Sequence, residues 1–311
     1  MKQNYLAKFY VFIRSYLRIL IFKIFKKNSR AINFFVKIDE YLRRLGVLNS
    51  ALDGQFTFEG IRFAYDKNDQ SVPSSIITNN YYEPETLQAI KQVLSPGSIF
   101  IDGGANIGFF SLIASKLVRE NGLVIAFEPT DVTRQYLIKN IYLNKLNNIL
   151  VDSSAISISE GEVVFKLEAN PEANSICMNH KLSEIEKNLN LVRVKSVSID
   201  SFCENNDIKY VDLIKLDIEG QELDAIRGSK KTLLNNQKIR IIFELNIYKN
   251  PKGIEYAKNI FNELIQIGFN HFETLVEPKV IIRSLNTDEE VELLKKLTSR
   301  HNLNILAARV E

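Results

Sequence analysis

The chain alternates short apolar runs with segments in which apolar residues recur every three or four positions. The runs suit buried strands, and the three-to-four spacing suits helices that cover a sheet. Strands and helices in alternation indicate βαβ units and a parallel sheet. The pattern predicts core strands at 98–102, 123–128, 149–156, 211–217 and 239–245. It predicts helices at 106–119, 131–144, 221–234 and 253–267.

Shorter features surround this core. Residues 55–65 alternate around Glu59-Gly60, which predicts a hairpin, and a helix is expected over 85–94. We also expect an extra strand pair and a terminal antiparallel pair, so the fold class is α/β, with a Rossmann-like, seven-stranded, mostly parallel sheet and an antiparallel last strand. These two pairs are predicted at 163–167 with 191–197 and at 269–276 with 303–310.

The first 50 residues have a different character from the rest. They carry eleven Lys and Arg against Asp39 and Glu40, a net charge of +9, which leaves −6 for residues 51–311. We therefore divide the chain into a basic amphipathic helical extension, 1–50, and one larger domain, 51–311. The apolar stripe of the extension is too often interrupted by charged residues for the extension to span a bilayer. The stripe is formed by Leu6, Phe9, Ile13, Leu17, Leu20 and Ile24.

This leader has two interpretations. Residues 1–30 can lie on an anionic membrane surface, because such helices combine an apolar face with Lys and Arg. Alternatively, the helix packs on the body or on a neighbouring subunit. The acidic charge of the body argues against nucleic acid as the substrate, since a groove that follows phosphates is basic.

Composition narrows the setting. Apolar residues make up 45% of the chain, enough for a substantial core. Two cysteines, Cys177 and Cys203, fit no metal-binding spacing and suit a reducing compartment. The three histidines lie far apart, so the sequence gives no support for a metal site. We expect a cytoplasmic protein, peripheral on the inner face of the membrane if the leader binds there.

The most informative segment follows the first core strand. Asp102 ends that strand, and a turn with Gly104 and Gly108 leads into a helix, at a spacing unlike the dinucleotide pattern G-x-G-x-x-G. The second strand ends in Glu128. A glycine turn combined with an acid after the next strand indicates an S-adenosylmethionine (AdoMet) site at the strand ends. Glycines let the backbone approach the methionine half, and Glu128 can accept both ribose hydroxyls.

Two further donor contacts are predicted at the same edge. Asn106 lies within the turn and can contact AdoMet, although a turn asparagine can equally cap its own backbone. The third strand ends at 152–155, where adenine contacts are expected, and Ser154 is the residue selected there.

Read in order, four segments give the chain a family resemblance. They are Asp102–Gly108, Phe127-Glu-Pro129, the Lys-x-Asp-x-Glu-Gly block within 214–222, and Ile241–Glu244. With them, the chain resembles the FkbM-type methyltransferases over residues 55–310. The resemblance implies AdoMet-dependent methylation, usually of a hydroxyl oxygen on sugars, glycans or other secondary metabolites. One departure is Gly103, where a valine is common.

Three carboxylates are candidates for catalysis. A sugar hydroxyl is a weak nucleophile, so a general base near it helps methyl transfer. Asp217 and Glu219 alternate at a strand end and should point to opposite faces, although both can instead cap the following helix. Glu244 ends the fifth strand and can bind the acceptor, act as base or serve structurally. Lys215 is expected to pair with a carboxylate.

The function expected from the sequence is therefore AdoMet-dependent O-methylation of a saccharide, glycoconjugate or secondary metabolite. One alternative is an NAD-dependent sugar oxidoreductase or epimerase, which the glycine spacing disfavours. Another is a non-catalytic membrane scaffold that keeps the fold. The intact set of acids and glycines weighs against that alternative.

Overall fold

The computed structural model describes most of the chain after the basic leader. The helix predicted within residues 1–50 lies outside the described residues. Contacts divide the chain into two units, 1–82 and 83–311, and each is described by itself. The described residues are 54–66, 72–79, 81–166, 175–176, 191–245, 247, 253–298 and 303–310.

The first unit contains the predicted hairpin. Strands β1 (Gln55–Phe58) and β2 (Ile61–Ala64) pair antiparallel. The connecting residues Glu59 and Gly60 both have positive φ, at 47° and 75°, as a tight two-residue hairpin turn requires. A helix that the sequence did not predict, α3 (Val72–Asn79), follows.

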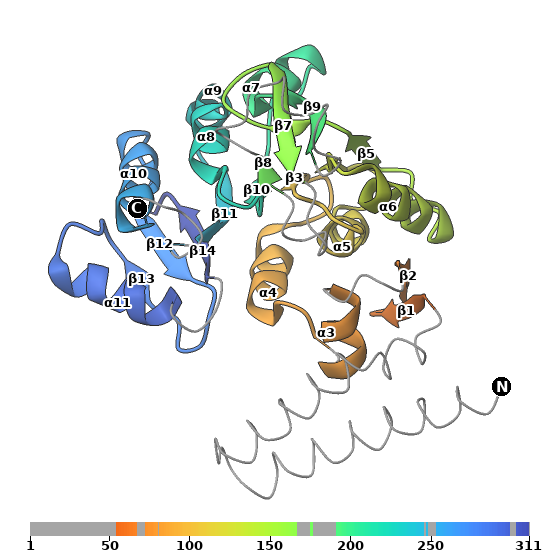
Figure 1. Cartoon of the computed structure of the whole chain (residues 1–311), viewed down its shortest axis with the longest axis horizontal. Coiled ribbons are helices and arrows are strands. Elements are labelled where there is room, and N and C mark those ends of the chain that lie inside the picture. Colours follow the sequence, from red (N-terminus) through yellow and green to blue (C-terminus); the bar gives the residue numbers. More distant parts are fainter. Residues whose placement is uncertain are drawn as a thin grey trace, which may run out of the picture. The chain divides into compact units, whose positions relative to one another are not determined.

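The second unit is built on an eight-stranded sheet of order β13-β12-β14-β11-β10-β3-β4-β5 (Figure 1). The five predicted core strands pair parallel, and the terminal pair is antiparallel, as predicted. Strand β14 inserts between β11 and β12 and runs opposite to both. An eighth, two-residue strand at the edge was not expected. The strands are β3 (Ile99–Gly103), β4 (Leu123–Phe127), β5 (Ile149–Asp152), β10 (Leu213–Leu216), β11 (Arg240–Leu245), β12 (His271–Thr274), β13 (Ile281–Ile282) and β14 (Leu303–Ala308).

A second, four-stranded sheet has the order β6-β9-β7-β8. The strand predicted at 149–156 is divided between the two sheets, because β5 stops at Asp152 and the chain turns there. The Asp152 carboxylate Oδ1 accepts a hydrogen bond from the Ser154 backbone at 2.7 Å, which stabilises that turn. The predicted extra pair is present as β7 and β9. The strands are β6 (Ala155–Ile156), β7 (Gly161–Lys166), β8 (Ser175–Ile176) and β9 (Leu191–Val197).

Helices cover both faces of the main sheet. The predicted helix at 221–234 is broken at Gly228, where a Cβ atom would lie 2.3 Å from the Ser157 carbonyl oxygen, so the chain is too closely packed there for another residue. Helices α7 and α11 were not predicted. The helices of this unit are α4 (Pro84–Val93), α5 (Phe109–Val118), α6 (Asp131–Leu143), α7 (Ile199–Asn205), α8 (Glu222–Arg227), α9 (Lys230–Asn235), α10 (Gly253–Gln266) and α11 (Asp288–Thr298).

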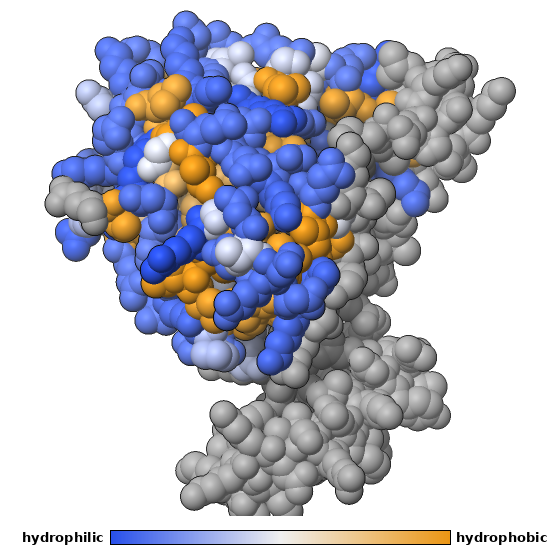
Figure 2. All heavy atoms as spheres, turned by 90° about the vertical axis from the view of Figure 1, so that its left-hand side faces the viewer, coloured by the Kyte–Doolittle hydropathy of each residue, from blue (hydrophilic) through white to orange (hydrophobic). Residues whose placement is uncertain are grey.

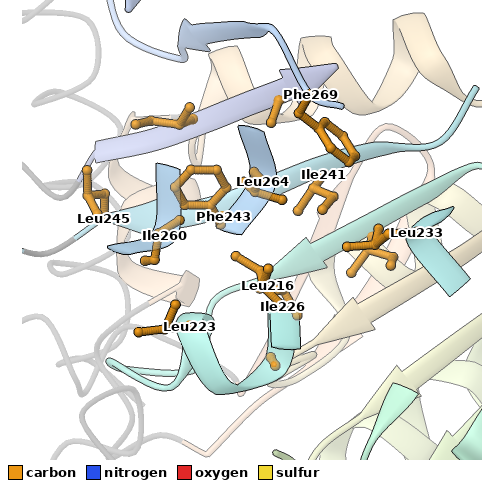
Figure 3. Close-up of a cluster of buried hydrophobic side chains, with 14 of the residues drawn as sticks. Leu216, Leu223, Ile226, Leu233, Ile241, Phe243, Leu245, Ile260, Leu264 and Phe269 are labelled. Carbon is orange, nitrogen blue, oxygen red and sulfur yellow. The ribbon is translucent and has the colours of Figure 1, made fainter. Parts of the chain in front are cut away.

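The core holds the central strands rigid from one face. Leu216 of β10 and Phe243 of β11 lie against side chains from α8 and α10, among them Ile226 and Ile260 (Figure 3). The Phe243 ring meets Phe261 edge-on at 6.3 Å. Burial of this kind contributes roughly 25 cal/mol per Å² of apolar surface, so it fixes the strand ends that carry the polar residues described below.

The surface is mixed in character. On the face in Figure 2, small apolar patches lie among mostly hydrophilic residues. Within the described residues, we find no helix with the length and apolar character needed to cross a membrane.

Candidate active site

The polar residues predicted for the site meet at one edge of the sheet. Asp102 lies in β3, Glu128 directly follows β4, Asp217 directly follows β10, and Glu244 lies in β11. Because these four strands are parallel neighbours, their carboxyl ends lie along the same edge. The positions of these acids at predicted strand ends suggest a common edge, and the parallel register of the four strands establishes it.

The glycine turn after β3 is tightly held. The backbone N–H groups of Gly104 and Ala105 both donate to the Phe127 carbonyl oxygen, at 3.1 and 3.0 Å. Gly104 has φ 75°, and Gly108, the N-cap of α5, has φ 91°. A Cβ on Gly108 would lie 2.5 Å from Cδ1 of Leu137. Both positions therefore need glycine, for conformation and for space.

Asp102 is a buried acid with one oxygen available. Asp102 is 1% exposed, and Ser111 Oγ donates a hydrogen bond to its Oδ2 at 2.5 Å. Within the described part of the chain, Oδ1 has no hydrogen-bond partner. Burial raises the pKa of this carboxyl above its ordinary value. A buried acceptor atom without a partner fits a site that receives a donor group from a ligand.

Glu128 is held by the backbone through both oxygens. Oε2 accepts the N–H of Asn106 and Oε1 accepts the N–H of Thr130, each at 2.9 Å. A carboxylate oxygen has a second lone pair, so each can still accept one ligand hydroxyl. Burial raises the pKa of Glu128 to about 7, although these hydrogen bonds lower it.

Asn106 contributes to this arrangement through its backbone. Its φ is 52°, and its side-chain Oδ1 accepts the N–H of Ile107 at 2.7 Å. The side chain thus caps the turn, which was the alternative weighed from the sequence. A direct contact between Asn106 and AdoMet remains a prediction.

A cleft of about 310 Å³ is lined by residues that directly follow Glu128 in the sequence. Pro129 and Thr130 form one side, and residues 192–195 of β9 form another. Among the described residues, Ser153 lines this cleft, and Ser154 lies beside it with its N–H bonded to Asp152. The adenine contact predicted at Ser154 stays a prediction, with its neighbour Ser153 closer to the open space.

The three predicted catalytic carboxylates lie together. One oxygen from each of Asp217, Glu219 and Glu244 lies within 4.8 Å of the others. The prediction that Asp217 and Glu219 point to opposite faces is wrong. Strand alternation ends with β10 at Leu216, and Glu219 has φ 54°, which turns the chain back. Within the described residues, these three could together offer oxygens to a cation, but Asp217 is already paired, and we assign no metal to them.

Lys215 pairs with a carboxylate, as predicted. Its Nζ lies 3.0 Å from Oδ2 of Asp217, and its side chain is 2% exposed. The ammonium also lies 4.9 Å from the centre of the Phe110 ring, a cation–π distance.

Sequence reasoning missed the residues that shape the loop after β10. Glu222 Oε1 accepts the N–H groups of Ile218 and Gly220, each at 3.2 Å, and Oε2 accepts the Tyr256 hydroxyl at 2.8 Å. Burial raises the pKa of Glu222 to about 7. Glu222 belongs to the family block, but its partner Tyr256 lies 34 residues later, so no local pattern could reveal the pair.

A second missed group lies beside Glu244. Asn304 of β14 is the register partner of Glu244, and its Nδ2 donates to Glu83 Oε2 at 2.8 Å and Thr86 Oγ1 at 3.1 Å. Glu83 precedes α4 with φ 39°. These bonds connect the start of α4 to the acidic edge of the sheet.

The fold and the site define the class of the protein. A mostly parallel sheet with this strand order, a glycine turn after β3 and an acid after β4 belongs to a Rossmann-like, AdoMet-dependent methyltransferase. The orphaned buried oxygen of Asp102, the glycines at positive φ and the two-sided support of Glu128 fit that cofactor. The model of the methyltransferase FkbM domain matches residues 102–271, more than half of the chain. The chain belongs to this family, and its cofactor is AdoMet.

Curated relatives agree in class. The chain is 25% identical over 145 residues to methyltransferase 1 of Beauveria bassiana, covering 42% of this chain and 58% of that protein. It is 26% identical over 185 residues to methyltransferase sdnD of Sordaria araneosa, covering 51% and 68%. It is 25% identical over 175 residues to the hexuronic acid methyltransferase AglP of Haloferax volcanii, covering 55% and 66%. The chain thus spans roughly six to seven tenths of these relatives.

The chain is also similar to solved methyltransferase structures. An AdoMet-dependent O-methyltransferase from Thermotoga maritima matches with a TM-score of 0.42 and 14% identity, over 78% of this chain and 72% of that one. A putative methyltransferase from Streptococcus mutans in complex with S-adenosylhomocysteine matches with a TM-score of 0.41 and 13% identity, over 74% and 99%.

Proposed function

We propose that this protein transfers a methyl group from AdoMet to a hydroxyl oxygen of a saccharide, a glycoconjugate or another secondary metabolite. The observation that carries the proposal is the group of three carboxylates, Asp217, Glu219 and Glu244, directly beside the glycine turn. Family membership favours methyl transfer over the oxidoreductase alternative.

The donor side is formed by the acids and glycines after β3 and β4. We assign the free oxygen of Asp102 to the amino group of the methionine half and the two oxygens of Glu128 to the ribose hydroxyls. Gly104 and Gly108 let the backbone come close. AdoMet, when bound, supplies a methyl carbon made electrophilic by its sulfonium.

The acceptor side is formed by the carboxylates. As the hydroxyl oxygen forms its bond to the methyl carbon, the carbon–sulfur bond breaks and the hydroxyl proton passes to a carboxylate. Asp217 is the first candidate for this base. Lys215 bonds to its Oδ2 and the side chain is 23% exposed, so Oδ1 stays accessible. Glu244 is 6% exposed and Glu219 half-buried, which suits both to hold the acceptor.

The saccharide class has two supports. Carboxylates accept hydrogen bonds from neighbouring hydroxyls, which sugars provide in abundance. One relative is named a hexuronic acid methyltransferase. The group of three carboxylates also agrees with the net charge of −6 on residues 51–311, which argues against a polyanionic nucleic acid.

A labelling screen tests the proposal. The protein is incubated with tritiated-methyl AdoMet and glucose, galactose, N-acetylglucosamine or glucuronic acid, each free and linked to a lipid phosphate, with total RNA as a separate substrate. We expect label in at least one saccharide and base-stable methyl ethers, with the Glu128→Ala variant as the control that transfers less label at low AdoMet concentration. Label in RNA alone would contradict the saccharide assignment. Binding of S-adenosylhomocysteine without any transfer would favour the non-catalytic scaffold.

We also propose that residues 1–50 act as a separate basic extension to a methyltransferase domain at 51–311. In a cytoplasmic protein, this extension would bring the site to an anionic membrane surface, close to a lipid-linked acceptor. The support is the charge of +9 together with the apolar stripe of the leader. Packing of the leader on protein is the competing proposal.

A further inference from the structure

Lys215 is an ammonium group buried in the middle of the sheet. All four residues of β10 are buried, and Lys215 is 1% exposed. Its register partner on β3 is Asp102, and its partner on β11 is Ile242. A buried ammonium is costly unless opposite charges compensate it.

Carboxylates from several elements surround this ammonium. Asp217 lies at 3.0 Å, and Asp102 on β3 and Glu83 before α4 also attract it. Burial acts to lower the pKa of Lys215, but these three acids together raise it above its ordinary value, so the ammonium stays charged. Glu219 and Glu244 adjoin Asp217, and Glu128 follows β4 at the same edge of the sheet.

Stability alone does not account for this arrangement. A buried ion pair is often no more stabilising than apolar side chains of the same volume. Leu213, Ile214 and Leu216, the other residues of β10, are apolar and fill the same strand. The charge is present only two residues before the catalytic carboxylate.

We propose that Lys215 is a positioning residue for methyl transfer: its ammonium holds Asp217 through Oδ2 and leaves Oδ1 to receive the proton of the acceptor hydroxyl. The proposal rests on the proposed function, in which Asp217 is the base. The same ammonium also attracts Asp102, its register partner on β3.

The test compares Lys215→Met, Asp217→Asn and the double variant with wild type. The matched control is Lys231→Met, which removes an exposed lysine paired with Glu204 at 3.1 Å. Aspartate is labelled with ¹³C at the carboxyl carbon, and the Asp217 signal is assigned by its loss in Asp217→Asn. Titration of that signal and calorimetric binding of S-adenosylhomocysteine need no acceptor. Turnover is measured with whichever sugar of the screen is methylated.

We expect the Asp217 signal to titrate at least about one pH unit higher in Lys215→Met, because a carboxylate without its cation holds its proton more tightly. Turnover at neutral pH should fall about a hundredfold, because Asp217 loses the cation that orients it, and the acid limb of the pH–rate profile should move to higher pH together with the Asp217 signal. S-adenosylhomocysteine affinity should stay within about threefold of wild type. The double variant should lose no more activity than Asp217→Asn alone, because both changes act through one carboxylate. A purely structural lysine would lower stability without moving the titration.

An unchanged Asp217 titration, or additive losses in the double variant, would overturn the proposal. If Lys215→Met does not fold, Lys215→Gln replaces it, and the wild type offers a further measurement. Its Lys215 ¹⁵Nζ signal should be protected from exchange at pH 8 and lose that protection in Asp217→Asn; equal protection in both would contradict the pairing. If wild type methylates no sugar, the proposed function fails, while the titration still decides the role of Lys215.

Discussion

Gly104 lies against the carbonyl oxygen of Asp217, so closely that a Cβ atom on Gly104 would be 1.9 Å from that oxygen. The two residues follow neighbouring parallel strands, β3 and β10. The glycine turn after β3 and the loop that carries the carboxylates proposed for catalysis are therefore in direct contact. A shift in one loop is transmitted to the other.

Gly104→Ala should disrupt both loops. The added methyl overlaps backbone, which cannot move aside as a flexible side chain can. We expect at least a tenfold loss of S-adenosylhomocysteine affinity by calorimetry, about 1.4 kcal/mol. The control is Gly60→Ala, because Gly60 has the same φ of 75° but no atom within 4 Å of its Cβ. In that variant the free energy of unfolding should fall by only about 1–2 kcal/mol, which is the cost of placing a side chain at positive φ. Equal behaviour of both variants would argue against the contact.

Glu128→Ala should weaken AdoMet and S-adenosylhomocysteine binding by at least tenfold, about 1.4 kcal/mol, because charge-assisted bonds to the ribose are lost. NAD should show no binding. Since the pKa of Glu128 is raised to about 7, its carboxylate becomes protonated as pH falls below that value. Wild-type affinity should therefore decline from pH 8 to pH 5, and Glu128→Gln should be weak but nearly independent of pH. Exposed Glu120→Ala is the control, and loss of affinity there would contradict the assignment.

Neutral isosteres separate the roles of the three carboxylates. Asp217→Asn should lower turnover about a hundredfold with S-adenosylhomocysteine affinity nearly intact, because a base acts on the acceptor and not on the donor. Glu219→Gln and Glu244→Gln should mainly raise the KM for the acceptor. Full turnover in Asp217→Asn would transfer the role of base to one of the other two.

Glu222 should make stability depend on pH. Its pKa is about 7 in the folded protein against 4.5 as the ordinary value, so the folded state holds this proton more tightly between those values. The free energy of unfolding should therefore fall as pH rises from 5 to 8, and Glu128 adds to the fall. In Glu222→Gln the fall should be smaller by at least about 1 kcal/mol, measured by urea denaturation. Exposed Glu160→Gln should keep the wild-type slope. An unchanged slope in Glu222→Gln would exclude this group as the cause.

The leader should bind anionic vesicles. Each cation near such a surface contributes about 1 kcal/mol, and salt screens the attraction. Full-length protein should co-sediment with vesicles containing phosphatidylserine at low salt and be released in high salt. A variant lacking residues 1–45 should stay in solution and still bind AdoMet, because the motifs all follow residue 80. Equal partitioning of the two proteins would favour a packing role, as would a truncation that does not fold.

Local patterns were sufficient for the frame of the fold. Apolar runs and helical periodicity predicted the parallel strands, the hairpin and the terminal antiparallel pair, because burial imposes its period on the sequence. The spacing of Asp102, Gly104 and Gly108 with Glu128 likewise predicted a glycine turn and an acid after neighbouring strands at one edge of the sheet. Each of these features depends on residues close in the chain or on strand order.

Tertiary structure decided what depends on distant partners. The positive φ of Glu219 brings it beside Asp217, against the expected alternation, because the strand had already ended. Tyr256 reaches Glu222 from α10, and β14 inserts Asn304 opposite Glu244. The sequence alone determined which acids and glycines this protein has and which strands carry them. Only the packing of the sheet decided which acids lie together and which cation attracts them, because those contacts join residues that no local pattern connects.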